Sequence, residues 1–186
     1  METIRLAREA KQLKNETGKD TPLTHEMILD NIYSPMTEDN CGRYRSPWFF
    51  PIVGLKGVDW LIPGGHKVDG LMDELLDWYN NHSQDLHPIE RAARLHNEFV
   101  RIHPLADGNG RIARLLLNYE LVKNGYPTIT IKATQRKEYV DAINESIMTG
   151  DITKMVDLIT RRMHSRLNLY DSIIRSADNE NNLINQ

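Results

Sequence analysis

The segment from Ile112 to Lys123 constrains the fold of this chain most strongly, because as a helix it would be apolar on most of its sides. Its apolar residues include Leu115, Leu116, Leu117 and Leu121. A helix of this kind has to be covered on several faces, so it predicts a central, buried helix in a larger helical domain. Lys123 in its last turn and Gly125 just beyond it are typical of a helix C-terminus.

Apolar residues recur with helical spacing in most other segments, and predict the helices that would surround the central one. The predicted helices cover residues 1–15, Thr24 to Ser34, Val68 to Tyr79, Pro88 to Ile102, Arg136 to Met148 and Asp151 to about Ser176. Thr128 to Lys132 predicts a short β-like link. Residues 177–186 are polar and rich in asparagine, which predicts a frayed chain end. We therefore expect a mainly α-helical fold.

Residues 35–67 break this pattern, because prolines and glycines interrupt any helix there. Trp48 to Val53 and Val58 to Ile62 are short runs of high β-propensity, with a turn expected near Leu55-Lys56-Gly57. The segment therefore predicts a small β-hairpin or extended flap. From these residues alone, an ordinary surface hairpin that packs its aromatic side chains explains the pattern equally well.

Composition excludes several classes of function. A formal net charge of −3 gives no general attraction to nucleic acid or to an anionic membrane. The single cysteine, Cys41, excludes a disulfide within the chain and a metal site made of several cysteines. Residues 1–14 contain no apolar signal core, and no apolar run approaches the ~18 residues of a membrane span. We expect a soluble, cytoplasmic protein without nucleic-acid or membrane partners.

The loop before the central helix has the composition of a phosphate-binding site. In Gly108-Asn109-Gly110, two glycines permit positive φ angles, which let successive backbone amides turn inward around an anion. The helix that starts near Arg111 adds unpaired amides and the positive end of its dipole. Arg111 and Arg114 are three residues apart and project from neighbouring positions of the first turn, and guanidinium groups suit phosphate oxygens.

His103 and Asp107, at the start of the same loop, add a base and a metal ligand. A neutral imidazole can take a proton from an attacking hydroxyl. One carboxylate together with phosphate oxygens is a usual environment for Mg²⁺. Together these groups predict phosphoryl or nucleotidyl transfer, although the chain has no Walker pattern. The alternative is a plain helix–loop–helix turn, in which His103 faces the helix dipole and the arginines are solvated surface.

These residues resemble a known signature. The order His103-x-x-x-Asp107-Gly108-Asn109-Gly110-Arg111-x-x-Arg114 is similar to the signature of Fic domains, H-x-F-x-[DE]-G-N-G-R-x-x-R, in the Fic/Doc superfamily. Leu105 replaces the usual Phe, and we interpret it as a packing variant that keeps an apolar anchor under the loop. Gly42-Arg43-Tyr44-Arg45 resembles the family's G-x-[FY]-R segment.

The resemblance covers about residues 35–160 and implies one Fic domain over residues 1–186. This domain would be a Fic-type helical fold with a small β-hairpin flap over the active site. N-terminal helices would occupy residues 1–34, and a C-terminal helix with a polar tail would occupy residues 161–186.

The resemblance also implies a protein adenylyltransferase, which transfers AMP from Mg·ATP to a Tyr, Thr or Ser hydroxyl of a target protein and of itself. His103 would be the general base, and Asp107 the ligand of Mg²⁺. The implied nucleotide-binding residues are Asp107, Gly108, Asn109, Gly110, Arg111, Ile112, Ala113, Arg114 and, near the nucleotide base, Tyr139. The flap would pair with an extended segment of the target, with Val53, Gly54, Leu55 and Lys56 nearest to the site.

Many Fic proteins are restrained by a motif [ST]-x-x-x-E-[GN], whose glutamate pairs with the second arginine of the signature. The segment that starts at Ser176 and ends with Glu180 and Asn181 fits, so the resemblance implies that Glu180 restrains Arg114. So loose a pattern also arises by chance in an asparagine-rich tail. Two other functions stay open: a hydrolase that removes AMP from proteins at the same site, and a non-catalytic, nucleotide-sensing module that binds peptides. The sequence names no target, and a homo-oligomer stays open.

Overall fold

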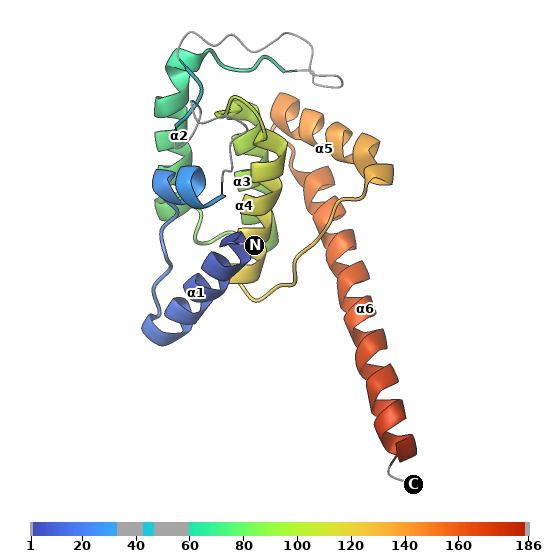
Figure 1. Ribbon diagram of the computed structural model, residues 1–186. Helices are drawn as coiled ribbons and strands as arrows, with labels where there is room; N and C mark the ends of the chain where they lie inside the picture. Colours follow the sequence, from blue (N-terminus) through green and yellow to red (C-terminus); the bar gives the residue numbers. More distant parts are fainter. Residues whose placement is uncertain (1, 33–42, 47–59, 185–186) are drawn as a thin grey trace.

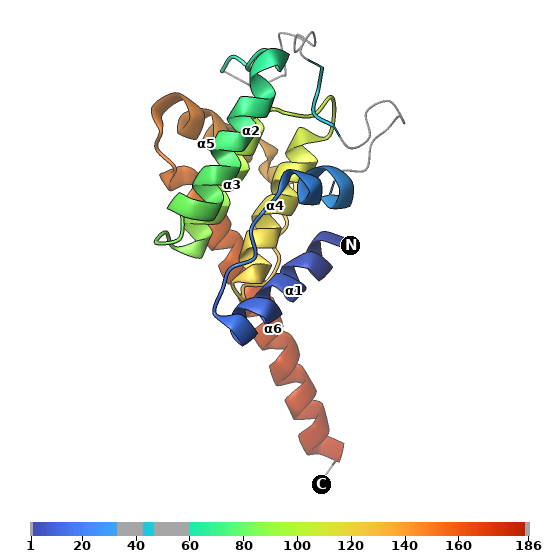
Figure 2. The same cartoon turned by 90° about the vertical axis from the view of Figure 1, so that its left-hand side faces the viewer.

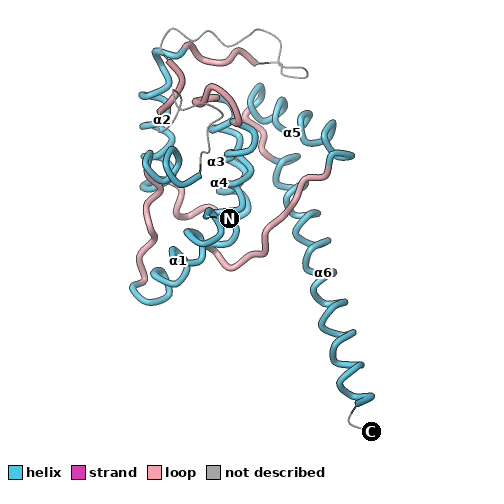
Figure 3. Tube along the Cα trace, in the orientation of Figure 1, coloured by secondary structure: helices cyan, strands magenta, loops and turns pink. Residues whose placement is uncertain are grey.

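The computed structural model describes residues 2–32, 43–46 and 60–184, and every regular element in these ranges is helical (Figures 1 and 3). The longer helices are α1 (Glu2–Thr17), α2 (Val68–Asp77), α3 (Pro88–Ile102), α4 (Asn109–Lys123), α5 (Arg136–Thr149) and α6 (Thr153–Ile184). The short helical turns are η1 (Met27–Ile32), η3 (Gly65–Lys67), η4 (Trp78–His82) and η5 (Ala133–Gln135). The prediction of a mainly α-helical fold is confirmed.

Helices α3 and α4 form a hairpin at the centre of the molecule, and the other helices pack around it (Figures 1 and 2). α1 packs on α4, whereas α2, α5 and α6 pack on α3. The apolar side chains of α4 are buried, with Ile112, Ala113, Leu116, Leu117, Tyr119 and Leu121 each 2% exposed or less. This confirms the prediction that α4 is the central, buried helix.

Local sequence signals set the ends of the hairpin helices. Pro88 occupies the first turn of α3, and the side chain of His87 accepts a hydrogen bond from the N–H of Ile89 at 3.2 Å. α3 ends where His103 takes up a left-handed conformation, and α4 begins after Gly108, which is left-handed with φ 80°. The connecting loop, residues 103–108, therefore lies at one end of the hairpin.

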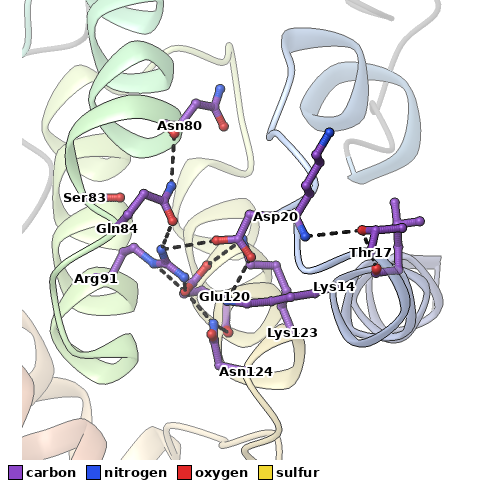
Figure 4. A network of polar contacts seen from close by, with 12 residues as sticks. Lys14, Thr17, Asp20, Asn80, Ser83, Gln84, Arg91, Glu120, Lys123 and Asn124 are labelled. Atoms are coloured by element: carbon purple, nitrogen blue, oxygen red, sulfur yellow. Dashed lines mark hydrogen bonds and ion pairs between the residues drawn. The ribbon is translucent and has the colours of Figure 1, made fainter.

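A cluster of buried charges holds the other end of the hairpin (Figure 4). Arg91 of α3 and Glu120 of α4 form an ion pair and are 2% and 0% exposed. Lys123 donates a hydrogen bond to the hydroxyl of Tyr79 at 2.9 Å, and that hydroxyl donates to Glu120. Asn124 also donates to Glu120, at 2.6 Å. These polar groups satisfy one another and tie η4, α3 and α4 together.

The predicted flap falls mainly on residues 33–42 and 47–59, which lie outside the described ranges. Val53, Gly54, Leu55 and Lys56 are among them, so the β-hairpin stays a prediction. Of the same stretch, residues 60–67 are described, and they form a loop and the short turn η3.

The predicted β-like link at residues 128–132 is wrong, because these residues form a loop. The side chain of Asn118 replaces a strand partner: its oxygen accepts from the N–H of Ile129 at 2.8 Å, and its nitrogen donates to the carbonyl of Ile129 at 3.2 Å. A polar side chain on the neighbouring helix thus satisfies the backbone that the β-propensity assigned to a sheet.

The predicted fraying after Ser176 is also wrong, because α6 continues to Ile184. Residues 177–184 contain neither proline nor glycine, so nothing in their backbone ends a helix. The first part of α6 packs on α3 and α5, and the rest projects away from the molecule (Figure 1). Among the described helices, none combines the length and the apolar character that crossing a membrane requires.

Candidate active site

The loop of residues 103–108 carries the predicted base, His103. The backbone of His103 has φ 53°, and in the described part of the chain no other residue except glycine has a positive φ. Left-handed backbone costs an ordinary residue about 1–2 kcal/mol, so surrounding contacts must hold it there. Its N–H donates to the carbonyl of Phe99 at 3.0 Å, which closes the last turn of α3. Backbone strain at a titratable residue is typical of an active site.

Arg45, the last residue of the Gly42 to Arg45 segment, contacts this loop and holds its backbone. Its side chain is buried, and its guanidinium donates to the carbonyls of His103 (2.7 Å), Pro63 and, at 3.3 Å, Ile102. Its backbone N–H donates to the carbonyl of Pro104 at 2.8 Å. Arg45 therefore satisfies carbonyl groups that the end of α3 leaves without helical partners, and it fixes the backbone beneath His103.

The imidazole of His103 is suited to act as a base. Burial lowers its pKa below the usual value of 6.5, although the contact with Val100 opposes this shift. Nδ1 lies 3.4 Å from the carbonyl oxygen of Val100. A proton on Nδ1 points to that oxygen and leaves Nε2 as the proton acceptor. His103 is therefore neutral at pH 7, with one nitrogen free to receive a proton.

Asn109 and Leu105 lock the shape of the loop. The side-chain oxygen of Asn109 accepts a hydrogen bond from the N–H of Leu105, and its nitrogen donates to the carbonyl of Leu105, both at 2.8 Å. Leu105 is completely buried, so it anchors the loop in the core where the family usually has Phe. Because the amide of Asn109 is engaged inside the loop, only its backbone N–H remains for a ligand.

The start of α4 supplies groups that can bind an anion. Gly108 is left-handed, as predicted, whereas Gly110 does not have a positive φ and serves a different purpose. A Cβ on Gly110 would lie 3.3 Å from Nη1 of Arg114, so glycine leaves room for that side chain. Within the described chain, the backbone amides of Asn109 and Gly110 donate to no acceptor, while the next two donate to the carbonyl of Gly108. Two amides at a helix N-terminus are thus available to a phosphate.

Three charged side chains of this region, those of Asp107, Arg111 and Arg114, form no ion pair with any described residue. Asp107 and Arg111 are exposed, and neither forms an ion pair within the described part of the chain. Arg114 is half-buried, and a cavity of ≈190 Å³ adjoins both arginines. Ile112 and Ala113 face the core, with 2% and 0% exposure, so only their backbone remains for a contact with nucleotide.

Arg114 is held by a chain of buried polar side chains. Its guanidinium lies 6.0 Å from the ring centre of Tyr139 in α5, in a cation–π contact. The hydroxyl of Tyr139 lies 2.7 Å from Nε2 of His96, whose Nδ1 lies 2.7 Å from Oδ1 of Asn97. Burial lowers the pKa of His96 to about 4, so its ring is neutral and bridges the two groups. Tyr139 is only 8% exposed, so here it supports Arg114, and its predicted contact with the nucleotide base stays a prediction.

The structure does not bring the predicted inhibitory residues to this site. Ser176, Glu180 and Asn181 belong to the projecting part of α6, whose end points away from the α3–α4 loop in both views (Figures 1 and 2). A contact between Glu180 and Arg114 inside one chain would require α6 to bend back. This contact stays a prediction.

Sequence reasoning missed Arg45, His96 and Asn97 as supports of the site. Arg45 enters the sequence analysis only as part of a resembling segment, and His96 and Asn97 were given no role there. The only available signal was the helical register of α3, which places the polar His96 and Asn97 on the side that has to be buried. A second cavity, of ≈300 Å³, is lined by residues of α2, α3 and the α5–α6 turn, but it contains no signature residue and is not the candidate site.

Comparison with known proteins agrees with this geometry. The profile of the Fic/DOC family matches residues 20–121, which include the whole loop and most of α4. The chain belongs to the Fic/DOC family. Among curated relatives, the protein adenylyltransferase Fic of Nematostella vectensis is 35% identical over 147 residues, which make up 78% of this Fic chain and 32% of the relative. The protein adenylyltransferase Fic of Drosophila virilis is 40% identical over 114 residues, or 58% of this chain and 23% of the relative.

Solved structures show the same fold. A Fic domain containing signaling protein from Bacteroides thetaiotaomicron has a TM-score of 0.71 and 26% identity, and the match covers 90% of this Fic chain and 67% of that chain. Fic-1 from C. elegans has a TM-score of 0.68 at 23% identity and covers 95% of this chain and 51% of that chain. The Fic chain therefore spans a third or less of the two curated relatives, and a larger share of the solved structures.

Proposed function

We propose that this Fic chain is a protein adenylyltransferase, which transfers AMP from ATP to the hydroxyl of a Tyr, Thr or Ser side chain of a target protein and of itself. The observation that carries the proposal is the arrangement of the α3–α4 loop. There, a neutral His103 in a strained backbone belongs to the same loop as two amides and the charges of Asp107 and Arg111, which have no hydrogen-bond acceptor or ion-pair partner among the described residues. The names of the curated relatives support the same activity.

In this mechanism, Nε2 of His103 takes the proton of the target hydroxyl as its oxygen attacks the α-phosphorus of ATP. A bond forms between that oxygen and phosphorus, the bond to the bridging oxygen breaks, and pyrophosphate leaves. The free amides of Asn109 and Gly110 hold phosphate oxygens, and Arg111 and Arg114 neutralise the outer phosphates. The loop backbone is held by Arg45 and by the contacts between Asn109 and Leu105, so the two amides would need little reorganisation during the step.

Mg²⁺ fits this site. The described residues contain no cluster of three or more side chains able to hold a metal by themselves. Asp107 is exposed, forms no ion pair within the described residues and lies two residues before the first of the two amides. One carboxylate with substrate phosphates is the usual environment of Mg²⁺. Asp107 would hold the ion, which when bound neutralises phosphate charge.

We further propose that the target binds as an extended strand on the flap, with Val53, Gly54, Leu55 and Lys56 nearest to the nucleotide. Pairing through the main chain would position a hydroxyl without requiring one target sequence. Substituting Lys56 by Pro removes a backbone donor in that segment and should lower transfer to a target protein more than self-modification.

The test uses ATP labelled on either the α- or the γ-phosphate, incubated with the chain and a cell lysate. Compared with the same incubation containing the His103→Ala variant, the parent chain should add label from the α-phosphate to protein and should add none from the γ-phosphate. Added label from the γ-phosphate would instead mean phosphate transfer and would contradict the proposal. Release of AMP from a previously modified protein, without forward transfer, would favour the hydrolase; ATP binding without any transfer would favour the binding module.

Restraint of Arg114 by Glu180 remains a separate proposal, which rests on the motif at Ser176 to Asn181 alone. Glu180→Gly should raise self-modification if the contact forms in solution. Equal rates in the variant and the parent chain would remove Glu180 from regulation.

A further inference from the structure

Four polar side chains from three helices form a chain that ends at Arg114. The guanidinium of Arg114 in α4 lies over the ring of Tyr139 in α5, 6.0 Å from its centre. The hydroxyl of Tyr139 lies 2.7 Å from Nε2 of His96 in α3, and the two rings meet edge to face. Nδ1 of His96 lies 2.7 Å from Oδ1 of Asn97. His96, Asn97 and Tyr139 are 0%, 2% and 8% exposed, so water hardly competes for these contacts.

Stability alone does not explain why these side chains are polar. Nδ2 of Asn97 is buried and, among the described residues, has no hydrogen-bond partner. The hydrogen bond of Asn97 through Oδ1 goes to His96. A buried polar group without a partner lowers stability, and apolar side chains of similar size would pack here without that cost. The polar side chains therefore indicate a role beyond holding the three helices together.

The hydrogen bonds of this chain have one favoured direction. His96 is neutral, because burial lowers its pKa to about 4, and a neutral imidazole donates from one nitrogen and accepts at the other. Oδ1 of Asn97 only accepts, so Nδ1 of His96 carries the proton and Nε2 accepts from the hydroxyl of Tyr139. The reverse direction would leave the hydroxyl proton of Tyr139 beside the positive charge of Arg114. In the favoured direction, Tyr139 offers that charge its ring face and its oxygen lone pairs.

Gly110 bounds the position of Arg114 on another side. A Cβ on Gly110 would lie 3.3 Å from Nη1 of Arg114, so the guanidinium lies directly against the start of α4. The cavity of ≈190 Å³ that adjoins Arg114 and residues 129–131 offers the same side chain a second position. The attraction of the ring of Tyr139 favours the position beside Gly110 over the one in the cavity.

We propose that His96 is a positioning residue for ATP binding: it orients Tyr139, and Tyr139 holds Arg114 beside Gly110, where the guanidinium can receive the outer phosphates. This inference rests on the function proposed above and gives His96 and Asn97 a part in nucleotide binding. The hydrogen bonds of His96 go to Asn97 and Tyr139, and none goes to the loop of residues 103–108. Loss of His96 should therefore weaken ATP binding and leave proton transfer by His103 intact.

The first test compares two polar replacements of His96. In His96→Gln, the side-chain oxygen can take the place of Nε2 and accept from Tyr139, whereas the shorter side chain of His96→Asn can replace only Nδ1. His96→Asn should raise KM for ATP about tenfold and lower kcat by less than about threefold, and His96→Gln should keep most of the affinity. Met72→Ala, at a buried apolar position of α2, is the control for lost stability alone and should leave KM unchanged.

Two outcomes of this test would overturn the proposal. The first is a KM for His96→Asn equal to that of the parent chain. The second is a fall in kcat without a change in KM, since that would place the effect of His96 on the chemical step.

The second test measures Mg·ATP binding by the shift in the urea-unfolding midpoint, which needs no AMP transfer. Arg114→Gln should weaken binding. Adding His96→Asn to Arg114→Gln should weaken it no further, because His96 acts through Arg114. Losses that add in the double variant would overturn the proposal.

The third test determines which nitrogen of His96 carries the proton, by ¹⁵N NMR of the chain labelled in its seven histidines. The spectrum of His96→Gln identifies the signals of His96. The proton should lie on Nδ1, and a proton on Nε2 would reverse the direction of the hydrogen bonds and overturn the proposal. If these results hold and Mg·ATP binds but no AMP is transferred, the proposed function fails while the positioning role of His96 stands.

Discussion

The two ends of the α3–α4 hairpin both carry charges, but these charges differ in burial and in pairing. At the end with Arg91, Glu120 and Lys123, the charges are 2% exposed or less and bind one another (Figure 4). At the other end, Asp107 and Arg111 are exposed and, in the described part of the chain, unpaired. Charges that satisfy one another hold the helices together, and charges left without partners are available to a ligand. In this hairpin, the charges that stabilise the fold and the charges that are available to a ligand therefore lie at opposite ends.

The largest expected effect is on catalysis at the loop end. His103→Asn should lower the rate of AMP transfer by about 10²–10⁴-fold, because a general base is removed. Asparagine tolerates the left-handed backbone at φ 53°, so the stability of the protein should change little. Transfer is measured by mass spectrometry after incubation with Mg·ATP. Activity close to that of the parent chain would remove His103 from the mechanism.

The next effect is on stability at the opposite end. Glu120→Ala should lower the free energy of unfolding by about 3–5 kcal/mol. Arg91 and Lys123 would stay buried and lose their closest counter-charge, which leaves them the longer ion pairs with Asp20, at 3.7 Å and 3.9 Å. The matched control is Asp107→Ala, which removes an exposed carboxylate and should change stability by less than about 0.5 kcal/mol while it impairs ATP binding. Urea unfolding measures both. Equal destabilisation by the two variants would show that charges at both ends contribute equally to stability, and would contradict the comparison.

Arg45 tests the comparison in another way, because it is a buried charge that holds the backbone at the loop end. Arg45→Leu should lower kcat by about 10²-fold, since a misplaced base loses its alignment, and should change KM for ATP less. Arg45→Lys, which keeps the charge but not the planar fork, should recover part of kcat. If kcat falls only in proportion to the unfolded fraction of the protein, Arg45 has a purely structural role.

A smaller effect concerns pH and the side chains behind Arg114. The pKa of His96 is about 4 in the folded protein and near 6.5 when unfolded, so below pH 6.5 the unfolded chain binds more protons. Stability from this group is therefore complete above pH 6.5 and falls as the pH drops, by about 3 kcal/mol at pH 4. His96→Gln should flatten that part of the stability profile. Parallel profiles of variant and parent would show that His96 does not titrate in this way.

The sequence predicted the parts of the fold that have local causes. Pro88 and Gly125 mark ends of the hairpin helices, and the apolar character of α4 placed it at the centre. In the signature loop, the left-handed conformation of Gly108 was predicted, and the chemistry assigned to the loop stays a prediction. Arg45 was not assigned a role, because it contacts the loop across 58 residues of sequence and a single sequence does not record such a contact.

Other details could not be predicted, because the type of a residue does not show which contact its side chain or backbone makes. Gly110 was expected to provide a positive φ, but it provides space for Arg114. Only the backbone amide of Asn109 was given a role, but its side chain also closes the loop on Leu105. The polar residues after Ser176 suggested a frayed tail, although polar residues without proline or glycine also continue a helix. Residue type alone therefore did not predict the structural part that Gly110 and Asn109 play in the loop.

The most direct measurement is the urea-unfolding midpoint of the Arg111→Gln/Arg114→Gln double variant, with and without Mg·ATP. The parent chain should be stabilised by Mg·ATP, since a ligand that binds only the folded state raises its stability. The double variant should lose this stabilisation and keep the stability of the parent in the absence of nucleotide. A nucleotide-free midpoint that falls as far as that of Glu120→Ala would show that the loop charges hold the fold, and would contradict the division between the two ends.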